Sequence, residues 1–197
     1  MVRRVDGESH LPGGGQFIEV DARTAPLIAA AMDPDGDLVD DRLVRGCRCF
    51  AVLAGGAVAG YGWLSTGSEW IGEIQLEIRP APGEGYLWNC FTLPEHRRKG
   101  VFRSVVTGIV DVAASAGLTR LWIGSVAIPA QQAMGPEGFE PALHMHSTIK
   151  AGMCWLKVIL PEEADQGLVD AAQERLGIGG RPLRIATTLR RSRPRRH

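Results

Sequence analysis

The sequence predicts an α+β fold (mixed α/β), with a mostly antiparallel central sheet flanked by helices. Three observations lead to this class. Residues 49–64 have the pattern of a β-hairpin, and residues 86–93 are apolar on both faces, as in a central strand. A long amphipathic helix then crosses over to a further buried strand at 121–126. Antiparallel strands followed by a crossover helix and more strands place the chain in this class.

Size and charge exclude several kinds of protein. The 197 residues fit one domain, and 22 basic residues balance 22 acidic ones, so the net charge of +0 favours neither nucleic acid nor an anionic membrane. No apolar stretch is long enough to span a bilayer, and no signal peptide follows the first residues. We therefore expect a cytoplasmic protein, and the scarcity of Lys beside Arg is typical of a GC-rich bacterial genome.

The first forty-five residues predict short elements. Residues 1–15 are polar and glycine-rich, which indicates a loose arm, and 16–20 form a first strand. Thr24 is expected to cap a short helix that carries Pro26 in its first turn. A second short helix is expected over 37–44.

The middle of the chain is rich in strand patterns. Residues 49–53 and 58–64 flank Gly55 and Gly56, which indicates a tight hairpin. Residues 70–79 alternate between apolar and polar side chains and are expected to form one strand before the central strand 86–93.

The second half begins with a helix from about Arg98 to Ala116, which carries one apolar stripe and ends at Gly117. Further elements are expected as strand 121–126, a helical segment 131–134, strands 139–149 and 153–160, and a helix 168–176. The basic tail 190–197 ends the chain without a recognisable element.

One segment carries the chemistry of an anion site. The central strand stops at Pro94, and a turn rich in cations opens into the long helix. The first amides of a helix have no intrahelical acceptor and form its positive end, so a pyrophosphate fits there. Gly100 allows close approach of the backbone to a ligand. The basic side chains are His96, Arg97, Arg98, Lys99 and Arg103. A helix start with solvated arginines is an alternative of equal weight on physical grounds.

This segment resembles the acyl-CoA loop of the GNAT superfamily. Within residues 93–102, Arg97 and Gly100 match the Arg and the first Gly of the family's Arg/Gln-x-x-Gly-x-Gly/Ala pattern, whereas Phe102 replaces the last small residue. Gly138 and Phe139 resemble the Gly-Phe pair that closes the second motif of the family. With the order of elements, the resemblance covers roughly residues 16–160.

The resemblance implies acetyl-CoA or another acyl-CoA as donor substrate, without a metal. It implies that the adjacent parallel strands 86–93 and 120–127 splay apart, that the backbone of 91–93 pairs with the pantetheine arm, and that the amides of 98–103 hold the pyrophosphate. The expected binding residues are Phe91, Thr92, Leu93, Arg97, Arg98, Lys99, Gly100, Val101, Phe102 and Arg103. The amide of Thr92 could also stabilise the oxyanion.

Catalytic residues are less well indicated. Met134 stands where the family usually has a Tyr acid, and Ile128 and Pro129 stand where it has an Asn. Glu77 and Glu73, on the polar face of the strand before the central one, are the nearest carboxylates and could act as a base through water. A solvated strand face is the alternative for both.

Other reactive side chains have simpler interpretations. Cys47 and Cys49 are expected to be buried thiols, and Cys90 would need a neighbouring base to act as a nucleophile. His144 and His146 point the same way from a strand but lack a third ligand, so no metal site is predicted. Most tryptophans are expected in the core, with an aromatic wall of the acceptor cleft as the alternative.

The sequence thus predicts an acyltransferase domain over 16–160, with a C-terminal helix and extension over 161–189. Its expected function is transfer of an acyl group from acyl-CoA to an amine of a small molecule or a protein, without membrane or nucleic-acid partners. The sequence is compatible with a homodimer. The alternative is a non-catalytic GNAT-fold module that senses acyl-CoA or holds a partner.

Overall fold

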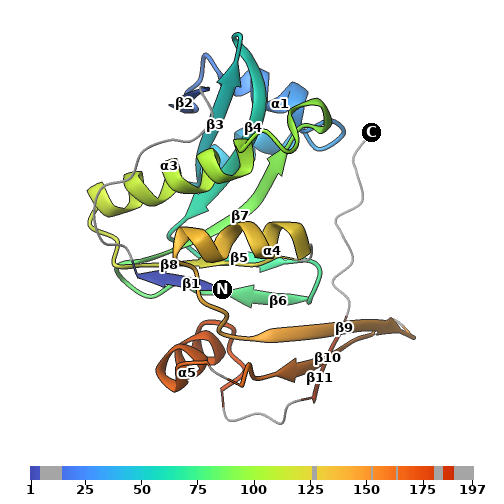
Figure 1. The fold of residues 1–197 in the computed structure, drawn as a ribbon. Helices are drawn as coiled ribbons and strands as arrows, with labels where there is room; N and C mark the ends of the chain where they lie inside the picture. The colour runs from blue at the N-terminus through green and yellow to red at the C-terminus, as the bar shows by residue number, and fades with distance from the viewer. Residues whose placement is uncertain (5–14, 126–127, 152, 163, 180–183, 189–197) are drawn as a thin grey trace. The chain divides into compact units, whose positions relative to one another are not determined.

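A computed structural model describes residues 1–4, 15–125, 128–151, 153–162, 164–179 and 184–188 (Figure 1). The predicted tail 190–197 and most of the predicted arm lie outside these residues. The chain divides into two compact units, Met1–Gly67 with Pro80–Glu140 and Ser68–Arg79 with Pro141–His197. Strands that we expected inside the domain 16–160 therefore group with the C-terminal helix.

The first unit contains a six-stranded sheet of order β1-β8-β7-β4-β3-β2. Its strands are β1 (Val2–Arg4), β2 (Gln16–Glu19), β3 (Arg48–Ala54), β4 (Ala57–Ser65), β7 (Glu84–Thr92) and β8 (Arg120–Ile123). All neighbours are antiparallel except β7 and β8, which confirms the mixed, mostly antiparallel sheet.

The start of the chain corrects one prediction. Val2–Arg4 is not part of a loose arm, because it forms β1 and pairs with Arg120–Trp122 of β8. Val2 is also buried and exchanges backbone hydrogen bonds with Glu140. A short polar stretch carries no apolar periodicity, so only the neighbouring edge of β8 decides that it becomes a strand.

Helices cover both faces of this sheet. The helices are α1 (Ala25–Ala31), α2 (Leu38–Val44), α3 (Val101–Ser115) and α4 (Ile128–Met134), with a 3-10 turn η2 (Gly135–Glu137) after the last. α3 crosses β3, β4 and β7 on one face (Figure 1). In β3, Phe50 packs in the cluster with α3, whereas Cys49 and Ala51 pack with α1 and α2. This alternation places the two clusters on opposite faces.

The start of α1 differs in detail from the prediction. Thr24 occupies the N-cap position but makes no side-chain cap hydrogen bond. Instead, Asp21 accepts from the backbone N–H of Thr24 at 2.9 Å and from the Thr24 hydroxyl at 2.9 Å. These hydrogen bonds lower the pKa of Asp21 to about 2.

The segment 70–79 is a hairpin and not the single strand that its alternation predicts. It consists of β5 (Glu69–Ile71) and β6 (Leu76–Ile78), which pair antiparallel. Gln75 turns the chain with a φ of +53° and donates its side-chain amide to the carbonyl of Gly72 at 2.6 Å. An alternating pattern does not show a reversal, because both strands of a hairpin can keep the same period of two.

The second unit contains a three-stranded antiparallel sheet of order β11-β10-β9, beside the hairpin β5–β6. Its elements are β9 (His144–Lys150), β10 (Met153–Ile159), α5 (Gln166–Arg175) and the unanticipated β11 (Arg184–Thr188). Asp165 caps α5 by accepting from the amide of Leu168 at 3.0 Å. In the described part of the chain, no helix is long and apolar enough to cross a membrane.

Candidate active site

The parallel strands β7 and β8 separate partway along their length. Their pairing runs from Glu84 opposite Arg120 to Leu87 opposite Ile123. β8 ends there, whereas β7 continues to Thr92. Residues 88–92 of β7 therefore have no β8 neighbour, and the predicted splay of this strand pair is confirmed.

A β-bulge bends β7 where the splay begins. Trp88 lies opposite Trp63 of β4, but Phe91 lies opposite Tyr61, so β7 has one extra residue between these pairs. Asn89 takes a φ of +46° there and is exposed. Asn89 is therefore part of the bulge in β7.

The backbone of Thr92 is directed toward the open side of β7. The amide of Leu93, the residue after β7, donates to the carbonyl of Ala59 in β4 at 3.0 Å. Because successive amides of a strand point to opposite edges, the Thr92 N–H points away from β4 and toward the splayed edge. Residues 91–93 are predicted to pair with the pantetheine arm. Of these, Thr92 has an N–H that points to the open edge, whereas the N–H of Leu93 is already hydrogen-bonded within the fold.

The loop after β7 forms a helix start with an unusual backbone. It begins with the 3-10 turn η1 (Pro94–His96). Arg98 has a φ of +60° and Gly100 a φ of +78°, and α3 begins at Val101, three residues after the predicted start. Residues with positive φ cannot continue a right-handed helix, so the first orphan amides belong to Val101, Phe102 and Arg103.

Three cations of the loop face solvent. Arg97, Arg98 and Lys99 are exposed, and none of them forms an ion pair with another residue in the described part of the chain. Arg97 lies over the ring of Phe91, with its guanidinium carbon 5.9 Å from the ring centre. This face of the loop can therefore accept an anion.

Arg103 behaves differently from the other cations. Its Nε lies 3.0 Å from Oε1 of Glu137, whose other oxygen accepts from the hydroxyl of Thr107 at 2.6 Å. Glu137 is largely buried. The Arg103 side chain thus links α3 to η2, while its backbone amide remains at the helix start.

Two glycines, which the sequence analysis did not single out, set the distance between β4 and α3. A Cβ on Gly60 would lie 2.7 Å from Val101 Cγ1 and 2.8 Å from the Phe91 carbonyl, and one on Gly62 would lie 2.9 Å from Val105 Cγ1. Glycine inside a strand often marks such a close approach, and this is the signal that could have found them.

Two residues that depart from the family pattern, Phe102 and Met134, lie in or against the core. Phe102 is half-buried against the cluster under α3, and Met134 is fully buried in that cluster together with Phe139. Gly138 precedes Phe139 with a φ of +79°. Met134 is therefore a packing residue at the position of the family's acid.

Burial keeps the two reactive groups beside the bulge protonated. It raises the pKa of the Cys90 thiol to about 12 and that of the Tyr61 hydroxyl to about 12. Neither group ionises at neutral pH, which argues against Cys90 as an acyl-accepting nucleophile.

We expect Cys90 to resist alkylation in the folded protein at pH 8. A pKa about three units above the ordinary 9.0 lowers its thiolate fraction by about 1000-fold. Peptide mass spectrometry after iodoacetamide treatment measures this, with urea-unfolded protein as control. Equal rates of labelling in both samples would contradict the prediction and restore Cys90 as a nucleophile.

The candidate bases do not lie on a neighbour of β7, whose sheet neighbours are β4 and β8. Glu77 lies in β6 and accepts from Arg79 Nε at 2.9 Å and NH2 at 2.6 Å. Glu73 lies exposed in the turn between β5 and β6. The topological premise that selected them is therefore wrong, and both belong to the second unit, whereas the loop belongs to the first.

The remaining cysteines and histidines have simpler roles in the described residues. Cys47 and Cys49 are buried thiols, as expected for small core cysteines. His144 and His146 lie in β9, and no cluster of three metal-ligating side chains occurs among the described residues.

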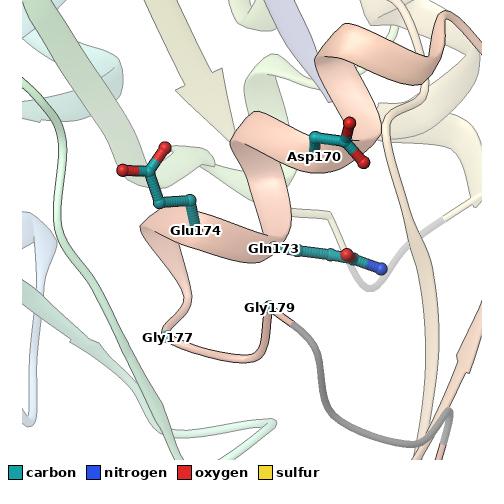
Figure 2. Close-up of a pocket in the computed structure, with 5 residues that line it drawn as sticks. All are labelled: Asp170, Gln173, Glu174, Gly177 and Gly179. Carbon is teal, nitrogen blue, oxygen red and sulfur yellow. The ribbon is translucent and has the colours of Figure 1, made fainter.

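A surface hollow lies beside the C-terminal end of α5 (Figure 2). Figure 2 shows the side chains of Asp170 and Glu174 pointing to different sides of the helix. Asp170 accepts from Gln166 at 2.7 Å, and Glu174 pairs with Arg175 at 2.8 Å. Gln173, Gly177 and Gly179 complete the lining. The described residues that line this hollow include no cation that could bind a pyrophosphate.

Comparison with known proteins agrees with the geometry of the first unit. The acetyltransferase (GNAT) family matches residues 18–135, more than half of the chain. No curated protein sequence matches.

Solved structures show the same fold at low sequence identity. An aminoglycoside N-acetyltransferase AAC(6')-Iy in complex with CoA is 14% identical, with a TM-score of 0.54 over 68% of this chain and 98% of that one. A ribosomal-protein-alanine N-acetyltransferase from Brucella melitensis biovar Abortus 2308 is 16% identical, with a TM-score of 0.51 over 71% and 100%. At such identities the likeness concerns the fold alone, but together with the family match over 18–135 it leads to one conclusion: the chain belongs to the acetyltransferase (GNAT) family.

Proposed function

We propose that this protein transfers an acetyl group from acetyl-CoA to an amine of a small molecule or a protein. One observation carries the proposal. The unpaired edge of β7 at Thr92 leads directly into a basic loop and the start of α3. A thioester donor with a long amide-containing arm and a pyrophosphate needs this combination of an open strand edge and an anion site.

Each part of the site has a role toward coenzyme A. The Thr92 N–H, at the splayed edge, donates to the pantetheine arm or to the thioester oxygen. The amides of Val101, Phe102 and Arg103 face the pyrophosphate at the positive end of α3. Arg97, Arg98 and Lys99 add charge-assisted contacts. The complex of the similar aminoglycoside acetyltransferase with CoA supports this assignment.

The chemistry is direct transfer. The neutral amine attacks the thioester carbonyl, a C–N bond forms, and the negative charge on oxygen is stabilised by a strand amide. The C–S bond then breaks, the amine proton passes to solvent, and the thiolate of coenzyme A takes a proton from solvent. Glu73 and Glu77 remain proposed bases that would act through water. Holding donor and acceptor together supplies most of the acceleration.

A second candidate is an acyl-CoA sensor without catalysis. Met134 favours it, because a fully buried thioether stands where the family usually has its acid. A sensor would bind acetyl-CoA without releasing coenzyme A.

Binding and turnover are expected to separate these candidates. Acetyl-CoA should raise the melting temperature, and a panel of primary amines should give thiol release with at least one acceptor. Glu77→Gln and Glu73→Gln enter the same assay, and a proposed base should lower kcat at neutral pH. Absence of both heat and thermal shift on acetyl-CoA addition would exclude both candidates, and binding without thiol release would favour the sensor.

A further inference from the structure

Arg42 lies on two tryptophan rings beside the splayed strand. It projects from α2, and its guanidinium carbon lies 4.4 Å from the ring centre of Trp88 and 5.0 Å from that of Trp63. The two rings lie 6.0 Å apart. Trp63 is fully buried and Arg42 is partly buried. The cation is therefore held in a partly desolvated aromatic site.

Among the described residues, no carboxylate forms a hydrogen bond or an ion pair with Arg42. In the described part of the chain, the only hydrogen bond of Arg42 runs from NH1 to the sulfur of Met32 at 3.9 Å. The groups that act electrostatically on Arg42 are Tyr61, Arg45, Cys47 and Cys49, and none of these is a carboxylate. A guanidinium has five N–H donors, and a buried charge is costly unless it is paired.

Two other arginines that lie over aromatic rings each pair with a carboxylate. Arg48 lies over Phe50, and its Nε lies 2.7 Å from a carboxylate oxygen of Glu19. Arg120 lies over Trp122 and pairs with a carboxylate oxygen of Glu84 at 3.0 Å.

Arg97 and Arg42 lie over rings without a carboxylate partner among the described residues. Arg97 belongs to the loop that we assign to an anion. Compared with Arg48 and Arg120, Arg42 lacks an anionic partner, and a ligand can supply one.

Two unpaired donors belong to the rings under Arg42, and a third lies farther along β7. The indole Nε1 atoms of Trp63 and Trp88 and the hydroxyl of Thr92 are buried and have no hydrogen-bond partner within the described residues. Trp63 pairs with Trp88 across β4 and β7, three residues of β4 away from Gly60, which lies opposite Thr92. At a strand rise of about 3.3 Å per residue, the Trp63–Trp88 pair under Arg42 thus lies about 10 Å along the sheet from the Gly60–Thr92 pair.

We propose that Arg42 binds a carboxylate of the acceptor, so that the acceptor is an amine that also carries a carboxylate several bonds away. The proposal rests on the acetyl transfer proposed above. The pyrophosphate of the donor is already assigned to the loop at 97–103, so the anion at Arg42 belongs to the other substrate. The separation of about 10 Å favours an extended ω-amino acid over one whose amine and carboxylate share a carbon.

The test compares probes that differ only in charge. We would titrate 6-aminohexanoate and 6-aminohexanamide into the protein saturated with coenzyme A, using calorimetry, and repeat this with β-alanine and 4-aminobutyrate to vary the spacing. The acid is expected to bind about 30-fold more tightly than the amide, as for a desolvated charge pair. In turnover, the same difference should appear in KM for the acceptor.

Substitutions test whether Arg42 causes the preference for the acid over the amide. Arg42→Met covers the rings without charge and should remove the preference for the acid, whereas Arg42→Lys, which lacks the planar fork, should retain only part of it. Arg48→Met is the matched control, because it also removes an arginine from an aromatic ring, and it should keep the full preference. Melting curves with acetyl-CoA establish that each variant is folded.

Several results would overturn the inference. These are equal affinity for acid and amide, failure of every ω-amino acid to bind while acetyl-CoA binds, or an unchanged preference in Arg42→Met. Failure of acetyl-CoA itself to bind would instead overturn the proposed function. The two failures are distinguishable because donor binding is measured before any acceptor is added.

Discussion

Gly100→Glu is expected to raise the Kd for acetyl-CoA by about 100-fold or more, measured by calorimetry. Gly100 has a φ of +78° at the N-terminus of α3, where a side chain adds strain of roughly 1–2 kcal/mol. A Cβ there would meet nothing within 4 Å, so the substitution does not disturb the core. It places a carboxylate where the pyrophosphate is expected, and like charges at the helix start oppose binding.

Gly117→Glu is the matched control for this prediction. Gly117 follows the other end of α3, has the same φ of +78°, and also has open space at the position of a Cβ. It carries the same backbone strain but lies away from the loop. Unchanged affinity in Gly117→Glu is expected, and an equal loss in both variants would show that strain in α3, and not the anion site, explains the effect.

Glu84→Ala is expected to lower the free energy of unfolding by about 3–5 kcal/mol. Glu84 is buried at the start of β7, and it accepts from Arg120 NH1 at 3.0 Å and from the indole of Trp122 at 2.8 Å. Both partners belong to β8, so the carboxylate joins the parallel strands below their splay. Its removal leaves a partly buried arginine and a buried indole without this acceptor.

Urea unfolding measures the difference, and the melting temperature should fall by roughly 10 °C for a protein of this size. Glu19→Ala is the control, because Glu19 pairs with Arg48 at 2.7 Å in an exposed position. An exposed ion pair contributes about 1 kcal/mol at most. Equal destabilisation by the two substitutions would contradict the importance that we assign to burial.

The order of elements could be read from the sequence because it depends on local patterns. The apolar stripe of α3 and the two-sided apolar character of β7 are each visible within about fifteen residues. The loop between them was found in the same way, since a strand end, a cluster of cations and a glycine are adjacent in the chain.

Contacts between distant residues were not visible. The strand at Val2–Arg4 exists because β8 offers an edge, and the reversal at 72–75 leaves the alternation of its two strands unchanged. The pairing of Arg103 with Glu137 depends on the meeting of α3 and η2. None of these features has a periodic signature.

The sequence by itself determined which residues we propose as the donor site of this protein. The residues Arg97 to Gly100 stand next to a strand end and a helix start, and an anion site of that kind needs only local backbone geometry. Only the tertiary structure brought together the residues of the proposed acceptor site. Arg42, Trp63 and Trp88 lie far apart in the chain, and their contact arises because α2 packs on the face of the sheet opposite α3. An unpaired charge is defined by what does not surround it in space, which no local pattern records.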